Sequence, residues 1–203
     1  MLLVGGAVVL VAILVAVFVI VSGGSKPAAA LGPEGMAIET GTPLADLSKE
    51  ATGQPVDGIQ CGATEQLAYH IHSHLAVYVN GELRPIPLGI GIVGLQVQQS
   101  QGFPFASATT CYYWLHTHAN DGIVHVESPT TKLYPLSDVF AIWGQPLSAG
   151  QVGPATGKVT AYVNGKLFTG DPATITLQSR EDIQLDVGTV VAPVPVDWSK
   201  SQL

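Results

Sequence analysis

Positive charge is scarce in this chain of 203 residues. Lys and Arg together number eight, against fifteen Asp and Glu, and the formal net charge is -7. A nucleic-acid-binding surface needs a basic stripe to neutralise phosphates, and no stretch of the sequence offers one. The composition therefore argues against a nucleic-acid partner, while the 47% of apolar residues are enough to build a sizeable core.

Cysteine is almost absent from the sequence. The two that exist, Cys61 and Cys111, each lie close to a histidine-rich segment. In an oxidising compartment we expect them to form one disulfide, which would close a loop of roughly 50 residues and contribute roughly 4 kcal/mol in the chain-entropy model. Two buried free thiols are the alternative. A disulfide would indicate a body outside the cytoplasm, in a periplasmic or extracellular space.

Methionine and the common catalytic motifs are also scarce. Met1 and Met36 are the only methionines, and no Cys-Met-His pattern of a blue-copper site is evident. No serine or cysteine stands in a nucleophile context, and no glycine-rich loop that could cradle a phosphate is present. Because the blue-copper pattern is missing, electron-transfer copper is less favoured than a mononuclear Zn²⁺ or Cu²⁺ site.

Charged and strongly polar side chains are missing altogether from residues 2–21, "LLVGGAVVLVAILVAVFVIV". Roughly 20 apolar residues in a helix span a hydrocarbon core about 30 Å thick. A secretory signal has a shorter apolar run of about 7–15 residues after a basic segment, which this chain lacks. We therefore expect residues 1–22 to be an uncleaved transmembrane anchor. Its partners would be membrane lipid and other membrane-protein subunits, since Gly5, Gly6 and Ala7 permit close helix contacts.

The rest of the chain divides into three parts. Residues 23–54 begin rich in Gly, Pro and Ala and are interpreted as a linker. Residues 55–192 alternate strand-like runs with turn signals and are predicted to form a histidine-rich β domain, with residues 193–203 as a C-terminal tail. The fold class is predicted to be mainly β, either a sandwich or a partly open barrel with short helices, preceded by one transmembrane helix.

Local signals place two helices and two hairpins. A short helix is predicted within the linker over residues 43–53, because a Thr-Pro pair is a typical helix start and Gly a typical end. A second helix is predicted within residues 134–147, "YPLSDVFAIWGQPL". The sequence Tyr-Val-Asn-Gly occurs at residues 78–81 and again at 162–165. Asn-Gly favours a two-residue type I′ turn, so each site predicts a hairpin.

All six histidines lie in two segments, "YHIHSHLAVYVNG" and "CYYWLHTHANDGIVHVESP". In the first segment, side chains on a strand alternate between faces, so His70, His72 and His74 would share one face. Leu75 and Val77 would lie on the opposite face, toward the core. A helix over the early part of this segment is the alternative that the pattern leaves open.

The second segment predicts a strand, a turn near Asp-Gly and a return strand. With a loop of two or four residues, His118 would face His125 and His116 would face Glu127, all four on one face. Imidazole and carboxylate donors suit Zn²⁺ or Cu²⁺. The first segment would supply further ligands, and Glu127 would be the final ligand or would orient an imidazole. A polar network without metal is the alternative.

Three segments together, "HIHSHLAVYVNG", "LHTHANDGIVHVESP" and "LSDVFAIWGQPL", resemble a group of poorly characterised exported bacterial and archaeal β-domain proteins. Those proteins carry an HxHxxL…VNG segment, an LHTHxxxGxIHVES segment and a short FxxWG helix. The resemblance covers about residues 69–147 of this chain. It implies an exported β domain with a metal site and supplies no established reaction.

These observations predict a membrane-anchored, exported accessory subunit of a membrane assembly, such as a respiratory or photosynthetic one, with a Zn or Cu site. The metal ligands are drawn from seven candidates, namely His70, His72, His74, His116, His118, His125 and Glu127. An enzyme is the main alternative, as a metal-dependent hydrolase or lyase in which Glu127 would act as the base. A module that buffers or delivers copper or zinc is the other.

Overall fold

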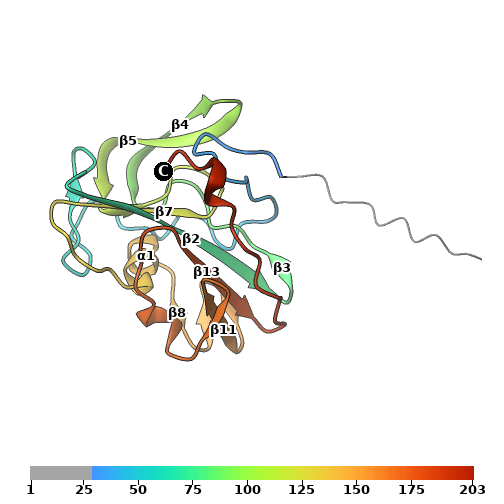
Figure 1. The fold of residues 1–203 in the computed structure, drawn as a ribbon. Helices are drawn as coiled ribbons and strands as arrows, with labels where there is room; N and C mark the ends of the chain where they lie inside the picture. The colour runs from blue at the N-terminus through green and yellow to red at the C-terminus, as the bar shows by residue number, and fades with distance from the viewer. Residues whose placement is uncertain (1–28) are drawn as a thin grey trace, which may run out of the picture.

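The computed structural model describes residues 29–203, which form one β-rich body (Figure 1). The predicted transmembrane anchor, residues 1–22, lies outside the described residues. Among the residues described, no helix is both long and apolar enough to cross a membrane. The fold is mainly β with short helices, as predicted from the sequence.

Strands of very different length make up the body. The strands longer than three residues are β2, Tyr69–Val79; β4, Ile92–Ser100; β5, Phe103–Tyr113; β7, Ile123–Ser128; β11, Val159–Val163; and β13, Glu181–Val187. The shorter strands are β1, Cys61–Gly62; β3, Glu82–Leu83; β6, Leu115–His116; β8, Leu147–Ser148; β9, Gln151–Val152; β10, Ala155–Thr156; and β12, Lys166–Phe168. Within residues 29–203 the helices are α1, Leu136–Trp143, and two 3₁₀ turns, Pro172–Thr174 and Trp198–Lys200.

The main sheet has the strand order β12-β11-β13-β2-β7-β6, with β3 paired to the end of β2. Its centre is β2, which runs antiparallel to β7 and parallel to β13. A second sheet has the order β1-β5-β4, and a small third sheet has the order β10-β9-β8. In Figure 1 the long β4–β5 hairpin lies above β7 and β2, while α1 lies below them.

The two faces of β2 differ as its sequence predicts. Leu75 and Val77 are 1% and 0% exposed and belong to the main hydrophobic core. Ile71 and Val79, on the same side of the strand, pack against that core. The histidines occupy the alternate positions and therefore the other face, which leaves them free to form a polar site.

Both Asn-Gly hairpins are confirmed. Val79 pairs with Glu82, and Val163 pairs with Lys166, so each loop has two residues. The φ angles are 52° at Asn80 and 50° at Asn164, and both following glycines also have positive φ. A type I′ turn requires positive φ at both central residues, and Asn-Gly adopts it with little strain.

The predicted disulfide is also confirmed. Cys61 and Cys111 are bonded, with their Cα atoms 5.4 Å apart. The bond ties β1 to β5, where Cys61 pairs with Tyr113 across the strands. It therefore fixes the start of the domain to the strand that carries one wall of the histidine cluster.

Helix α1 lies within residues 134–147, where it was predicted. Its side chains Val139, Phe140 and Trp143 are at most 1% exposed and pack into the core. The helix ends at Gly144, which has a left-handed φ of 70°. A Cβ atom at this position would lie 2.0 Å from the carbonyl oxygen of Lys49, so the close approach of two backbones requires glycine here.

The helix predicted over residues 43–53 is wrong. These residues form bends and a turn, with Leu44 and Ala51 buried in the core. The N-cap and proline signals are real, but burial of single apolar residues against the β domain overrides a helix that has no continuous apolar face. The part of the linker that is described is thus packed into the body.

The C-terminal tail also packs on the body. The backbone N–H of Gln202 donates to the carbonyl oxygen of Glu34, so the tail lies along the first described segment. The two ends of the described chain therefore meet near the histidine face of β2.

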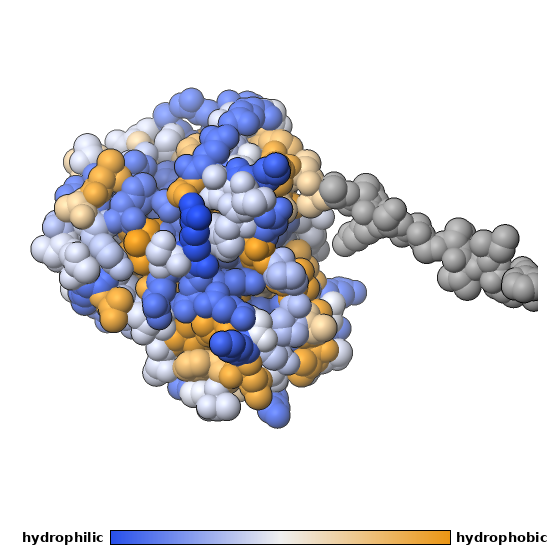
Figure 2. Space-filling model, viewed as in Figure 1, coloured by the Kyte–Doolittle hydropathy of each residue, from blue (hydrophilic) through white to orange (hydrophobic). Residues whose placement is uncertain are grey.

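On the face of the body seen in Figure 2, apolar residues form separate patches divided by a polar band.

Candidate metal centre

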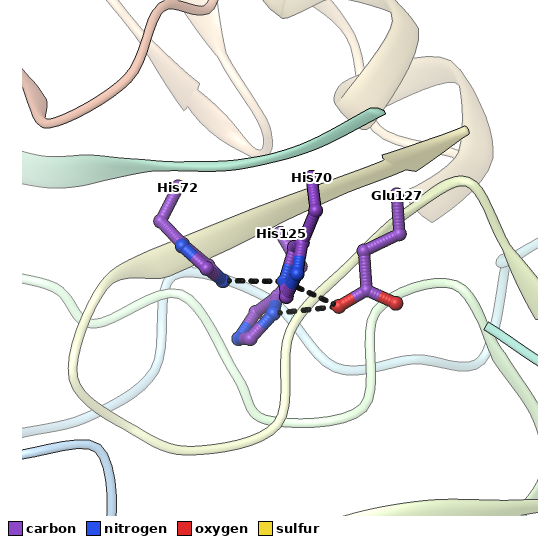
Figure 3. A group of neighbouring side chains, drawn as sticks. All are labelled: His70, His72, His125 and Glu127. Atoms are coloured by element: carbon purple, nitrogen blue, oxygen red, sulfur yellow. Dashed lines mark hydrogen bonds and ion pairs between the residues drawn. The ribbon is translucent and has the colours of Figure 1, made fainter. Parts of the chain in front are cut away.

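The pairing of β2 with β7 brings the two histidine segments together. Across these antiparallel strands His70 lies opposite Glu127, and His72 lies opposite His125. Opposed residues of neighbouring strands project to the same face, with Cβ atoms about 4.5–5.5 Å apart. The side chains of His70, His72, His125 and Glu127 therefore gather on one side of the sheet (Figure 3).

The predicted register of the second segment is wrong by two residues. His116, not His118, pairs with His125 across β6 and β7. The loop between these strands is six residues long, Thr117 to Gly122, rather than two or four. A shift of two positions preserves the face on which each side chain lies, so His116 still projects toward His125 and Glu127.

His118 reaches the cluster from the loop rather than from a β6–β7 strand pair. Its carbonyl oxygen accepts from the N–H of Ala106 at 2.8 Å, and its Nδ1 lies 2.7 Å from the Ala106 carbonyl oxygen. The ring of Phe105 stacks on the imidazole with the centroids 4.8 Å apart. Contacts with β5 therefore fix the position of His118, which lies in the loop between β6 and β7.

Hydrogen bonds determine the tautomers of His116 and His118. The Nδ1 atom of His116 lies 2.8 Å from the carbonyl oxygen of Tyr113, and that of His118 faces Ala106 in the same way. A carbonyl oxygen can only accept, so each Nδ1 must carry the hydrogen. In the neutral ring, Nε2 is then a lone-pair acceptor.

When both rings are neutral, their Nε2 lone pairs face each other. The Nε2 atoms of His116 and His118 are 3.0 Å apart, and the side chains are 0% and 6% exposed. Two acceptors at this distance repel unless a cation lies between them. Two nitrogens on one tetrahedral Zn²⁺, with bonds of 2.0–2.1 Å, would be about 3.3 Å apart. The spacing therefore fits a shared metal ion or a shared proton.

His125 lies between carboxylates. Its Nε2 is 2.7 Å from Oε1 of Glu34, and its Nδ1 is 3.1 Å from Oε1 of Glu127. Burial lowers the pKa of His125 well below its usual value and raises that of Glu34. The consistent arrangement is a neutral imidazole that accepts from a protonated Glu34 and donates to Glu127.

Burial governs the protonation of the other groups. It lowers the pKa of His72 to about 3 and holds that of His116 well below the usual value. It raises the pKa of Glu127 to about 7, with help from the charge on Glu65. At His118 burial is outweighed by the Glu65 carboxylate, 3.4 Å away, and the pKa is raised. The rings of His72, His116 and His125 are therefore neutral and keep a lone pair available.

The donors form two groups, within each of which the ligand atoms all lie within 4.8 Å of one another. One group comprises His70, His72, His125 and Glu127, and the other comprises His116, His118, His125 and Glu127. Six of the seven sequence-predicted residues are thus brought together.

His74 is the exception. It lies between Glu39 and Asp182, with each of its ring nitrogens 3.4 Å from one of their carboxylate oxygens. Although burial opposes the charge, these two carboxylates raise its pKa to about 9. His74 is therefore an ion-paired imidazolium beyond the end of the cluster, and neither donor group includes it.

The sequence did not reveal Glu34 and Glu65, which the fold brings to the cluster. Glu34 comes from the segment interpreted as a linker, and Glu65 from the loop between β1 and β2. Neither has a motif around it, since each reaches the site only through tertiary packing. The cluster opens into a cavity of about 660 Å³, which is also lined by Arg180 and Leu203.

Comparisons with protein-family models, with curated proteins and with solved structures found no match to this chain.

Proposed function

We propose that this chain is a membrane-anchored, exported accessory subunit that binds Zn²⁺ or Cu²⁺ at its histidine cluster. The observation that supports metal binding most directly is the pair of facing Nε2 lone pairs on His116 and His118. Each Nδ1 donates to a backbone carbonyl, so the repulsion between these nitrogens is relieved only by a cation. A proton can fill this gap, and a metal ion would displace it.

The donor set favours zinc or copper among the common metals. Imidazole and carboxylate are good ligands for Zn²⁺ and Cu²⁺, whereas Cu⁺ and iron–sulfur clusters need thiolate or thioether ligands. Both cysteines are used in the disulfide, so they offer no thiolate. The carbonyl partners of His116 and His118 would orient the rings toward the ion, as outer hydrogen bonds do at metal sites.

Two features support an anchored and exported protein. Residues 2–21 are apolar throughout, which suits a single transmembrane helix in contact with lipid and with other subunits of a membrane assembly. A disulfide persists in an oxidising compartment and is rare in the cytosol. We therefore propose a body in the periplasmic or extracellular space. The net charge of -7 supports the absence of a nucleic-acid partner.

A metal-dependent hydrolase or lyase is the second candidate, and the cavity beside the cluster favours it. Glu65 is partly exposed in this cavity and touches His118, so it could act as a base near a bound metal. Arg180 at the same cavity could orient an anionic substrate. A buffering or delivery module needs the same ligands but no substrate. A survey of hydrolytic activity with the metal-loaded chain therefore separates a hydrolase from a buffering module.

Metal titration tests the proposed function. The full chain, purified in detergent and stripped with a chelator, should bind Zn²⁺ or Cu²⁺ in competition with a chromophoric chelator. His116→Ala and His118→Ala should each weaken binding at least tenfold, because each removes one nitrogen of the facing pair. His74→Gln is the matched control, since His74 lies outside both donor groups, and it should bind as the wild type does. Equal affinity in all four proteins would refute the proposal.

The location has its own test. In cells, the chain should resist extraction by carbonate, and its body should be reached by a protease added outside the cytoplasmic membrane. Cleavage only after the cytoplasm is opened would overturn the proposed location.

A further inference from the structure

The cluster contains a second histidine pair that resembles the first. The Nε2 atoms of His70 and His72 are 3.0 Å apart, as are those of His116 and His118. Figure 3 shows the His70–His72 pair on β2, in which His72 faces His70 and His70 faces Glu127. Each pair forms a four-residue donor group together with His125 and Glu127, which both groups share.

One metal ion cannot accept all of these donors. With bonds of about 2.1 Å, two ligand atoms on the same ion are at most about 4.2 Å apart. The six donors do not form a single group within 4.8 Å but divide into two overlapping groups. Six ligands would also exceed the four of a tetrahedral zinc site. The donors therefore provide two positions for metal ions rather than one large site.

Glu127 lies between the two positions. Its Oε1 atom is 3.1 Å from Nε2 of His70 and 3.9 Å from Nε2 of His116. Its Oε2 atom is buried and has no hydrogen-bond partner among the described residues. Burying a carboxylate oxygen without a partner is costly, and a bound cation would be such a partner. Pairs of metal ions about 3.5–4 Å apart are common in two-metal sites, and a carboxylate has the reach to bridge them.

His125 is in contact with both pairs. Its ring centroid lies 4.5 Å from that of His72 and 4.7 Å from that of His118, with the planes perpendicular in each case. It can therefore complete the coordination of one ion while it packs against the ligands of the other.

We propose that the cluster is a dinuclear metal centre. The first ion is held by His70 and His72. The second ion is held by His116 and His118. Glu127 bridges the two. This inference rests on the proposed metal-binding function and adds the number of ions and their separation.

The number of bound ions tests this inference. The full chain in detergent is stripped of metal, reloaded with Zn²⁺, passed over a desalting column and analysed for zinc per chain. The wild type should retain two ions, and His70→Ala and His118→Ala should each retain one. His70 is 38% exposed, so its replacement leaves the core intact and keeps the test informative if His118→Ala misfolds. His74→Gln, on the same face of β2 and outside both groups, should retain two.

X-ray absorption of the zinc-loaded wild type provides a second measurement. It should show a metal–metal vector of about 3.5–4 Å. One ion per chain, or two ions without this vector, would overturn the dinuclear centre and leave the proposed metal-binding function intact. No retained ion would overturn both.

Discussion

His72 on β2 and His125 on β7 stand directly opposite each other, with their rings perpendicular and the centroids 4.5 Å apart. This cross-strand contact joins the two histidine segments. A slip of one residue between β2 and β7 would turn His72 away from His125 and would also expose Leu75 and Val77. The register that buries the core is thus the same register that assembles the cluster.

The tautomers of the facing histidines can be observed directly. In long-range ¹H–¹⁵N spectra of the zinc-loaded chain, His116 and His118 should carry a hydrogen on Nδ1 and none on Nε2. His74 should carry a hydrogen on both nitrogens at neutral pH, because its two carboxylate partners raise its pKa to about 9. A spectrum with Nε2–H on either His116 or His118 would contradict the arrangement derived from the Tyr113 and Ala106 carbonyls.

Loss of the disulfide should destabilise the body. The double variant Cys61→Ser, Cys111→Ser removes a cross-link between residues 50 positions apart. The chain-entropy model predicts a loss of roughly 4 kcal/mol in the free energy of unfolding. Urea unfolding of the variant and of the wild type measures it, and the wild type in reducing agent should behave as the variant does. Superimposable curves for oxidised wild type and variant would show that the bond adds no stability.

Glycine at position 144 should be essential to the end of α1. Gly144→Ala forces a side chain into a left-handed conformation and places Cβ 2.0 Å from the Lys49 carbonyl oxygen. Gly102→Ala is the matched control, because its φ of 85° is also left-handed but no atom lies within 4 Å of the added Cβ. We expect a loss of about 1 kcal/mol at Gly102 from conformation alone, and at least about 2 kcal/mol at Gly144. Equal losses in thermal or urea unfolding would mean that the backbone near Lys49 moves freely.

Stability should fall with rising pH because of Glu50. Burial raises the pKa of Glu50 to about 7, despite a hydrogen bond from the N–H of Gly91, and no residue in the described part of the chain is a hydrogen-bond partner of its buried Oε2. The folded state therefore binds a proton that the unfolded state, with a pKa near 4.5, releases first. The stabilising proton is fully present below about 4.5, and its contribution is lost as pH rises through about 7.

Replacing this carboxyl group tests its role. Glu50→Gln should remove part of the decline in the free energy of unfolding between pH 5 and pH 8, and at pH 8 the variant should be more stable than the wild type. Glu82→Gln changes an exposed carboxylate on β3 and should leave the decline unaltered. Parallel pH profiles for wild type and Glu50→Gln would rule out Glu50 as the source.

Features that depend on neighbouring residues could be predicted from the sequence. The Asn-Gly turns follow from the positive φ that both residues tolerate, and the faces of β2 follow from strict alternation along the strand. Helix α1 was predicted from its apolar pattern and its terminal glycine. In each case the physical cause lies within a few residues, so the local sequence contains it. The residues chosen for the cluster were predicted in the same way, from histidines at alternate positions.

Features that depend on distant parts of the chain were missed. The loop after His116 is longer than assumed because the backbone of His118 pairs with Ala106 on β5. The parallel pairing of β2 with β13 has no local signal, since each strand carries the same kind of alternation whatever its neighbour. Glu34 enters the cluster because the first described segment folds back over the body. Such contacts are decided by the packing of whole elements.

The parallel pair of β2 and β13 has a consequence for how the protein is made. All six histidines and Glu127 leave the ribosome before β13, Glu181–Val187, has been synthesised. Until then one edge of β2 has no partner strand, and the N–H of Arg180 is not available to fix the carbonyl oxygen of His72. For that interval the growing chain carries every donor of the proposed metal site without the framework that sets the spacing of these donors. If the proposed function holds, copper or zinc met at this stage would bind these donors in arbitrary combinations, so loading would have to follow the completion of translation, once β13 has joined the sheet.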